Sequence, residues 1–265
     1  MLIKFISKSI IKSKKNCYYW IGLVLIFKKK EGSFMIKVSD LHKCYGSGQG
    51  RIEVLKGIDL EFEDKKIICV LGPSGSGKST LLNILGGIEN IDGGEVDVLG
   101  NKLSKMSKRE LENYRREYLG FIFQFYNLIS DLNVFENIEV GKFLSKNPVD
   151  IEYLINELGL TDHKYKYPNE ISGGQAQRTS IARAIIKRPR LLICDEPTGA
   201  LDYDSAKDVL RIIEKLNRDY ESTVIIATHN VQIAKMCDLI LSLHNGKIKS
   251  FEVNTNKLLA KEVVW

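Results

Sequence analysis

Residues 67–80 have the sequence IICVLGPSGSGKST, in which a continuous apolar run leads directly into a loop of glycine, serine and lysine. The run is too short for a helix and shows no polar alternation, so it predicts a strand buried on both faces of a parallel sheet. The loop matches the pattern G-x-x-x-x-G-K-S/T in full, in which the glycines let backbone N–H groups surround phosphate oxygens. Lys78 would reach the β and γ phosphates of a nucleotide, and the Ser79 hydroxyl would ligate Mg²⁺. The residues expected to contact the nucleotide here are Gly72, Pro73, Ser74, Gly75, Ser76, Gly77, Lys78, Ser79 and Thr80.

Two later apolar runs, 191–194 and 224–227, predict further strands of the same sheet. The first ends in Asp195 and Glu196, and the second leads to His229. Because functional groups of an α/β sheet gather at the carboxyl ends of its strands, we expect these side chains beside the phosphate loop. Asp195 is suited to bind Mg²⁺ through a water molecule, and Glu196 is placed to polarise an attacking water. The sequence therefore predicts an α/β fold with a mostly parallel core sheet and nucleotide chemistry at one edge.

Helical patterns surround these strands. Apolar residues over 209–216 follow the i, i+3, i+4, i+7 spacing of a helix that covers a sheet. Ser107 and Ser172 are each followed three residues later by Glu or Gln, the spacing of a capping box at a helix start. Asn-Gly within 244–247 predicts a β-hairpin. The stretch of about 103–188 is mostly helical in pattern, which suggests a helical subdomain set into the α/β core.

The composition, 44% hydrophobic and 27% charged residues, is that of an ordinary globular domain. Residues 1–34 hold eight lysines and one glutamate, a local charge of +7 within the chain's +6, which leaves −1 for residues 35–265. The folded part is therefore nearly neutral, and we expect no nucleic-acid partner. Five widely spaced cysteines without a C-x-x-C pair suit a reducing compartment.

The N-terminal segment allows two interpretations. Its apolar run, 18–27, has only ten residues, whereas a spanning helix needs about 20, and Lys28–Lys30 stand where a signal peptide would have a cleavage site. The segment 1–34 is either a peripheral anchor on anionic lipid or an upstream extension of a protein that starts at Met35, and we favour the extension. The expected division is an extension 1–34, a domain 35–255 and a tail 256–265.

The pentapeptide ISGGQ, Ile171 to Gln175, lies 23 residues before Glu196, counted from Gly173. With the phosphate loop and LLICDEP it resembles ATP-binding cassette (ABC) ATPases, whose signature is usually LSGGQ, over about residues 36–250. The resemblance implies a P-loop NTPase of the ABC type, with an antiparallel β subdomain beside the core sheet and an inserted helical subdomain. It further implies these roles: Tyr45 stacks on adenine, Gln124 is the Q-loop glutamine, 199–202 form the D-loop and His229 is the switch histidine.

The family's mechanism implies a head-to-tail dimer around two Mg·ATP. The nucleotide on one copy is then covered by Ser172, Gly173, Gly174 and Gln175 of the other, with Asp202 of the D-loop nearby. Glu196, Lys78, His229 and Gln124 would carry catalysis. Gln124 would also sense the nucleotide and contribute to the metal site together with Ser79 and Asp195.

The resemblance also implies a separate membrane permease that places this chain at the cytoplasmic face of the membrane. Phrases such as YPNEISGGQAQRTSIARA and DEPTGALD look most like the macrolide-exporter, lipoprotein-release and bacitracin-type peptide-resistance branch. Members of that branch export peptides, lipoproteins or drugs, or transmit mechanical force. The alternatives are a non-transport ABC ATPase and a regulatory module that signals through a membrane partner.

Overall fold

The computed structural model describes residues 35–264, which fold as one unit, Phe34–Trp265. Both interpretations of the segment 1–34 concern residues outside the described part of the chain. Within residues 35–264 no helix is long and apolar enough to cross a membrane.

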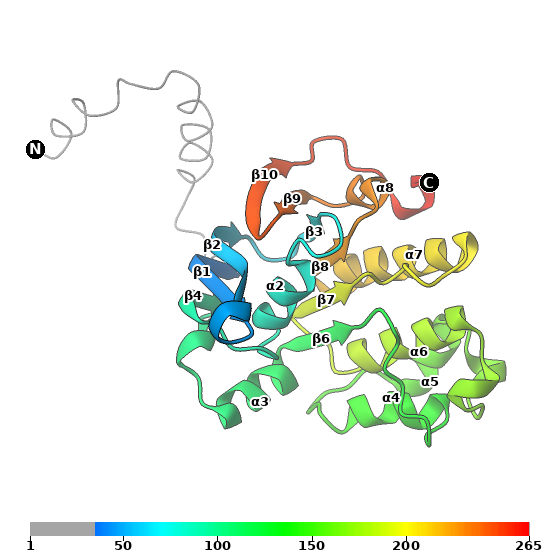
Figure 1. Cartoon of the computed structure of the whole chain (residues 1–265). Coiled ribbons are helices and arrows are strands. Elements are labelled where there is room, and N and C mark those ends of the chain that lie inside the picture. The colour runs from blue at the N-terminus through cyan, green and yellow to red at the C-terminus, as the bar shows by residue number, and fades with distance from the viewer. Residues whose placement is uncertain (1–34, 265) are drawn as a thin grey trace, which may run out of the picture. The chain divides into compact units, whose positions relative to one another are not determined.

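The core is a six-stranded sheet with the strand order β10-β9-β3-β8-β7-β6 (Figure 1). Neighbouring strands are parallel except β10, which pairs antiparallel with β9. The three predicted strands and the predicted hairpin are confirmed. The strands are β3 (Ile67–Leu71), β6 (Leu119–Ile122), β7 (Leu191–Asp195), β8 (Thr223–Thr228), β9 (Leu239–His244) and β10 (Lys247–Val253).

Strand β6 was not predicted, because its four residues LGFI lie within a stretch of mostly helical pattern. It pairs parallel with β7, with Leu119 opposite Leu191. A Cβ added at Gly120 would lie 2.8 Å from Pro189 Cγ, so the close packing of this strand requires glycine. The core sheet therefore gains its edge strand from inside the range 103–188.

A second sheet, entirely antiparallel, has the order β2-β1-β4-β5. It confirms the antiparallel β subdomain that the family resemblance implied. Its strands are β1 (Ile36–Tyr45), β2 (Ile52–Phe62), β4 (Gly93–Val98) and β5 (Asn101–Lys102).

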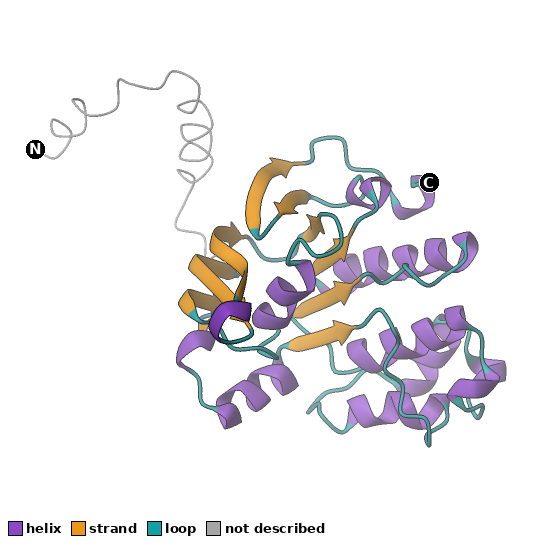
Figure 2. Ribbon diagram, in the orientation of Figure 1, coloured by secondary structure: helices purple, strands orange, loops and turns teal. Residues whose placement is uncertain are grey.

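The core sheet is buried on both faces, as its apolar strands require. Ile68 and Val70 pack in one cluster with the antiparallel sheet, whereas Ile67 and Cys69 of the same strand pack in the other cluster with the helices. This alternation is the two-residue period of a strand between two layers. Figure 2 shows the strands with helices beside them.

The helices are α2 (Lys78–Leu85), α3 (Lys108–Glu117), α4 (Val134–Lys142), α5 (Ile151–Glu157), α6 (Gly173–Ile185), α7 (Tyr203–Tyr220) and α8 (Val231–Ala234). Both predicted capping boxes are present, at Ser107 and Ser172. Helix α4 packs against α6. Short 3-10 helices occur at Gly48–Gly50, Leu103–Lys105, Thr161–His163, Pro168–Glu170 and Ala260–Glu262.

Candidate functional site

The phosphate loop, 72–80, leads from β3 into α2. Gly75 and Gly77 have φ values of 75° and 103°, which residues with a Cβ rarely adopt. Gly72 is needed for space, because a Cβ there would lie 2.3 Å from the carbonyl oxygen of Leu243. The loop therefore depends on its glycines for both conformation and packing.

Lys78, the first residue of α2, is 6% exposed. Its Nζ donates hydrogen bonds to the carbonyls of Gly72 (2.8 Å) and Pro73 (3.1 Å) and lies 3.7 Å from Oε1 of Glu196. The ammonium group thus connects the loop with the acidic pair. Phosphate oxygens would be stronger partners than these neutral carbonyls, because both sides of the bond would be charged.

Glu196 follows β7 with a φ of 47°, in the left-handed region that is uncommon for residues other than glycine. Its N–H donates to the carbonyl of Ala227 at 3.0 Å, which anchors the turn to β8. Its Oε1 lies 3.1 Å from Nδ1 of His229, which donates when it carries the proton. The structure therefore brings the predicted lysine, glutamate and histidine together at the carboxyl edge of the core sheet.

Asp195, at the end of β7, has a carboxylate that suits a cation. Its Oδ1 is buried without a hydrogen-bond partner among the described residues. Burial raises the pKa of this carboxyl, and a hydrogen bond with Ser79 opposes that shift. No cluster of three or more His, Cys, Asp or Glu that could enclose a metal occurs within residues 35–264. The oxygens present, the unpaired Oδ1 of Asp195 and the Ser79 hydroxyl bonded to the same carboxylate, fit Mg²⁺, which typically takes one or two protein oxygens and otherwise water and phosphate oxygens.

Gln124 lies two residues after β6, and its side chain is exposed. A Cβ added at Gly199 would lie 3.7 Å from its Nε2 and 3.6 Å from the Cβ of Glu196. The unpredicted strand thus delivers this glutamine to the edge that carries the acidic pair. The pattern of the residues did not show this placement, and only the family resemblance singled out Gln124.

Tyr45, the last residue of β1, is 40% exposed. Its hydroxyl donates to Oε2 of Glu89 at 2.5 Å and lies 3.5 Å from the hydroxyl of Thr80. Lys43 lies with its Nζ 5.2 Å from the ring centroid and pairs with Glu89 at 3.2 Å. The ring is therefore fixed next to the phosphate loop. Lys43 and Glu89 belong to no motif, so the sequence pattern does not mark them.

The ISGGQ signature forms the N-terminus of α6. The Ser172 hydroxyl accepts a hydrogen bond from the N–H of Gln175 at 3.3 Å, and Oε1 of Gln175 accepts one from the N–H of Ser172 at 2.8 Å. Gly173 and Gly174 are crowded as well, because a Cβ would lie 2.8 Å from the Tyr126 hydroxyl and 2.6 Å from Ser205 Oγ, respectively. These bonds join signature residues to each other rather than to the phosphate loop of the same chain.

Asp202 is the N-cap of α7, and its Oδ1 accepts a hydrogen bond from the N–H of Ser205 at 3.0 Å. The hydrogen bonds from Ser205 lower the pKa of this carboxyl. The helix starts at Tyr203, six residues before the apolar pattern over 209–216 that predicted it.

Comparisons with known proteins agree with this geometry. A family model described as "ABC transporter" matches residues 55–199. A protein of Mycoplasma pneumoniae, the putative ABC transporter ATP-binding protein MG065 homolog, is 42% identical over 234 residues, which cover 87% of this chain and 50% of that protein. The bacitracin export ATP-binding protein BceA of Halalkalibacterium halodurans is 40% identical over 219 residues, which cover 81% of this chain and 87% of BceA. The chain belongs to the ABC transporter family.

The solved structures give the same family fold. The ATP-binding cassette MJ0796, in a dimeric post-hydrolysis state bound to ADP and Pi, matches with a TM-score of 0.77 and 32% identity, covering 83% of this chain and 98% of that one. The chain is thus an ABC ATPase cassette, and its resemblance to the bacitracin-type branch is confirmed. It spans about half the length of the first curated relatives that it matches.

Proposed function

We propose that two copies of this cassette close head to tail on two ATP molecules and hydrolyse them. The observation that carries the proposal is the distribution of anion sites in one chain. The phosphate loop shares its sheet edge with Lys78, Glu196 and His229, whereas the signature at the N-terminus of α6 makes no hydrogen bond to that loop within the described part of the chain. A helix N-terminus attracts phosphate, so Ser172 and the glycines after it would cover the nucleotide held by a second copy.

The residues of the site would divide the work of hydrolysis. Lys78 would exchange its bonds to the loop carbonyls for bonds to the β and γ phosphates. Glu196 would orient and deprotonate the attacking water, and His229 would hold the carboxylate through the bond to its Oε1. Mg²⁺, held by Ser79, Asp195 and Gln124, would supply electrostatic stabilisation of the phosphoryl group. Tyr45 would stack on adenine, and Asp202 would lie near the nucleotide.

We further propose that the closing movement of the two copies is passed to a separate membrane permease. The permease also holds the cassette at the cytoplasmic face of the membrane. An open surface hollow of about 520 Å³ could receive part of this partner and so favours the proposal. Phe143 and Leu144 on its wall are 79% and 45% exposed, so a partner would shield apolar surface from water. The hollow is lined by Arg116, Glu117, Phe143, Leu144, Ser145, Lys146, Asn147, Lys187 and Arg188.

The charges of this hollow favour one kind of occupant. Arg116, Lys146, Lys187 and Arg188 outnumber Glu117. Burial lowers the pKa of Lys187 to about 8, so an acidic neighbour would stabilise its charged form. A cytoplasmic helix of the permease with apolar and acidic side chains would suit the site. We expect Phe143→Asp to abolish co-purification with the membrane protein encoded beside this gene, whereas Tyr165→Asp, which changes a residue that is 71% exposed, keeps it.

The dimer proposal is tested by the molar mass of the Glu196→Gln chain in solution. This variant should bind ATP without completing hydrolysis, so light scattering should give the mass of two copies in Mg·ATP and of one copy in Mg·ADP. The monomer mass under both conditions, with ATP binding verified, would contradict closure on the nucleotide.

A further inference from the structure

The helix that follows His229 is only one turn long, α8 (Val231–Ala234). Asn230 caps its start, because its Oδ1 accepts a hydrogen bond from the N–H of Gln232 at 2.9 Å, and its own N–H donates to the Thr228 hydroxyl at 3.0 Å. Helices this short have a costly nucleus and are marginal alone. Ile233 and Ala234 bury one side of α8 in the core, and the position of the helix, and with it that of His229, depends further on what holds its other end.

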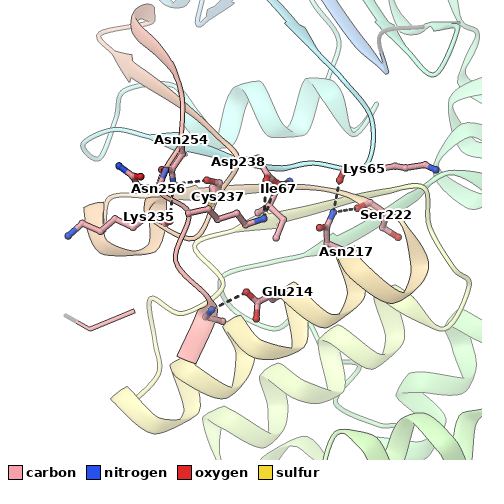
Figure 3. Close-up of polar contacts among 12 residues, drawn as sticks. Lys65, Ile67, Glu214, Asn217, Ser222, Lys235, Cys237, Asp238, Asn254 and Asn256 are labelled. Carbon is pink, nitrogen blue, oxygen red and sulfur yellow. Dashed lines mark hydrogen bonds and ion pairs between the residues drawn. The ribbon is translucent and has the colours of Figure 1, made fainter. Parts of the chain in front are cut away.

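That other end is held by the segment 254–263, which follows β10. The side-chain amide Nδ2 of Asn254 donates to the carbonyls of Lys235 and Cys237, both at 2.9 Å (Figure 3). The N–H of Leu258 donates to the same Lys235 carbonyl at 2.9 Å. Lys235 is the C-cap of α8, and Cys237 lies in the turn that follows, so one asparagine side chain supplies donors to two carbonyls at the exit of the helix. Asn254 thus clamps the end of α8 to the chain after β10.

The same segment also reaches the strand that leads to the phosphate loop. Oδ2 of Asp238 accepts a hydrogen bond from the N–H of Ile67, the first residue of β3, at 2.8 Å. Both oxygens of Asp238 lie 3.1 Å from Nζ of Lys257, and its carbonyl accepts from the N–H of Asn254 at 2.9 Å. Figure 3 shows Asp238, Ile67 and Asn254 close to one another. The segment is therefore anchored to the core sheet and is not a loose end against α8.

A third anchor lies on α7. The N–H of Ala260 donates to Oε1 of Glu214 at 3.1 Å. Ala260 and Val263 are 0% and 1% exposed and belong to the same apolar cluster as Ile233 of α8. These contacts hold the segment 254–263 against Asp238, α7 and the apolar core. The side-chain amide of Asn254 is therefore held in a fixed position.

From this geometry we infer that Asn254 is a positioning residue for ATP hydrolysis, which holds His229 against Glu196 through α8. The inference rests on the proposed roles of His229 and Glu196. Loss of the Asn254 amide removes two of the three hydrogen bonds described above between the segment 254–263 and the exit of α8, and the loosened helix would let His229 move away from the carboxylate. The phosphate loop and Tyr45 make no hydrogen bond to α8 among the described residues, so nucleotide binding should be unaffected.

The test is the steady-state hydrolysis of ATP by the full chain carrying Asn254→Ala. We expect kcat to fall on the order of tenfold, less than the roughly 100-fold that a misplacement of about 1 Å can cost, because the hydrogen bond from Leu258 remains. KM for ATP and nucleotide affinity should stay unchanged. Asn254→Gln, which keeps the amide donors, should recover part of kcat. Asn256→Ala is the matched control in the same turn, because Asn256 contributes its backbone N–H rather than its side chain. Rates are compared well below the melting temperature of each variant.

A double-mutant cycle with His229→Ala separates positioning from a general loss of stability. If Asn254 acts through His229, adding Asn254→Ala to His229→Ala should lower the residual kcat no further. An unchanged kcat in folded Asn254→Ala, or a full additional loss in the double variant, would overturn the inference. Wild-type hydrolysis by His229→Ala alone would instead contradict the proposed function, so the two failures are distinguishable.

Discussion

At the carboxyl edge of the core sheet two buried oxygens, Oδ1 of Asp195 and Oγ of Ser76, have no hydrogen-bond partner among the described residues. At the amino edge of the same strands the corresponding polar groups are paired. Ser222 Oγ donates to the carbonyl of Pro189 at 2.6 Å, and Nδ2 of Asn217 donates to the carbonyls of Ser222 (2.8 Å) and Lys65 (3.2 Å) (Figure 3).

The two edges of the core sheet therefore serve different purposes, nucleotide binding at one and stability of the fold at the other. Buried polar atoms without partners cost stability, and they are retained here beside the phosphate loop, where nucleotide oxygens, Mg²⁺ and water would pair with them. The amino edge makes no such provision and stabilises the fold. Changes at the carboxyl edge should therefore alter binding and catalysis with little loss of stability. Changes around Asn217 and Ser222 at the amino edge, whose side chains make no hydrogen bond to α8 within residues 35–264, should do the reverse.

The largest expected effect comes from two glutamates, one at each edge, that share a left-handed backbone. Glu196 and Glu221 have φ values of 47° and 52°. Glu196→Gln should reduce the rate of ATP hydrolysis at least about 100-fold, because the proposed general base is lost, whereas Glu221→Gln should keep the wild-type rate. Phosphate release measures both. Equal rates for the two variants would remove Glu196 from the mechanism.

Two lysines give the next comparison. Lys78 is buried at the phosphate loop, and Lys65 pairs with Glu221 at 2.7 Å on the exposed amino edge. We expect Lys78→Met to weaken ATP binding by about 10- to 100-fold, the value of one to two charge-assisted hydrogen bonds, and Lys65→Met to leave it unchanged. Calorimetric titration with ATP measures the affinity of both variants. Wild-type affinity in Lys78→Met would contradict the proposed role of Lys78 in binding the phosphates.

At the amino edge, Asn217→Ala should lower the free energy of unfolding by about 1–2 kcal/mol, because two carbonyls lose their donor. The neighbouring exposed Arg218→Ala should change it by less than about 0.5 kcal/mol. Urea unfolding measures both values, and ATP affinity should be normal in each variant. A catalytic defect in Asn217→Ala with intact stability would break the division between the edges.

The smallest expected effect is a gain in the stability of the nucleotide-free chain. Burial raises the pKa of Asp195 in the folded chain, so its contribution to stability is fully present below the unfolded pKa of about 3.9 and is lost as the pH rises through the folded value. Asp195→Asn should therefore stabilise the nucleotide-free chain near neutral pH by about 1 kcal/mol. Melting curves across pH should show the gain shrinking towards acid pH. A variant less stable than wild type at neutral pH would indicate that the carboxylate supports the fold.

The sequence predicted much of the carboxyl edge, because apolar runs, glycines and charged groups mark it directly. Strand β6 could not be predicted, because four residues with a glycine cannot be distinguished from the surrounding helical pattern. Two further residues, Glu89, which fixes Tyr45, and Asn254, which clamps α8, could not be predicted for another reason. Their partners lie 44 and 17–19 positions away in the chain, so tertiary contacts rather than local spacing define what they do.

The head-to-tail arrangement is tested most directly by mixing two inactive chains. Lys78→Ala disables the phosphate loop. Ser172→Asp keeps the cap of α6, because aspartate is a good N-cap, but sets a negative charge against the γ phosphate of the partner's ATP. A mixed dimer then contains one intact site, formed by the phosphate loop of the Ser172→Asp chain and the signature of the Lys78→Ala chain. We predict that the mixture recovers ATP hydrolysis that neither chain shows alone, with Ser107→Asp, at the other capping box, remaining active by itself. A mixture that binds ATP but stays as inactive as its parts would contradict the shared site.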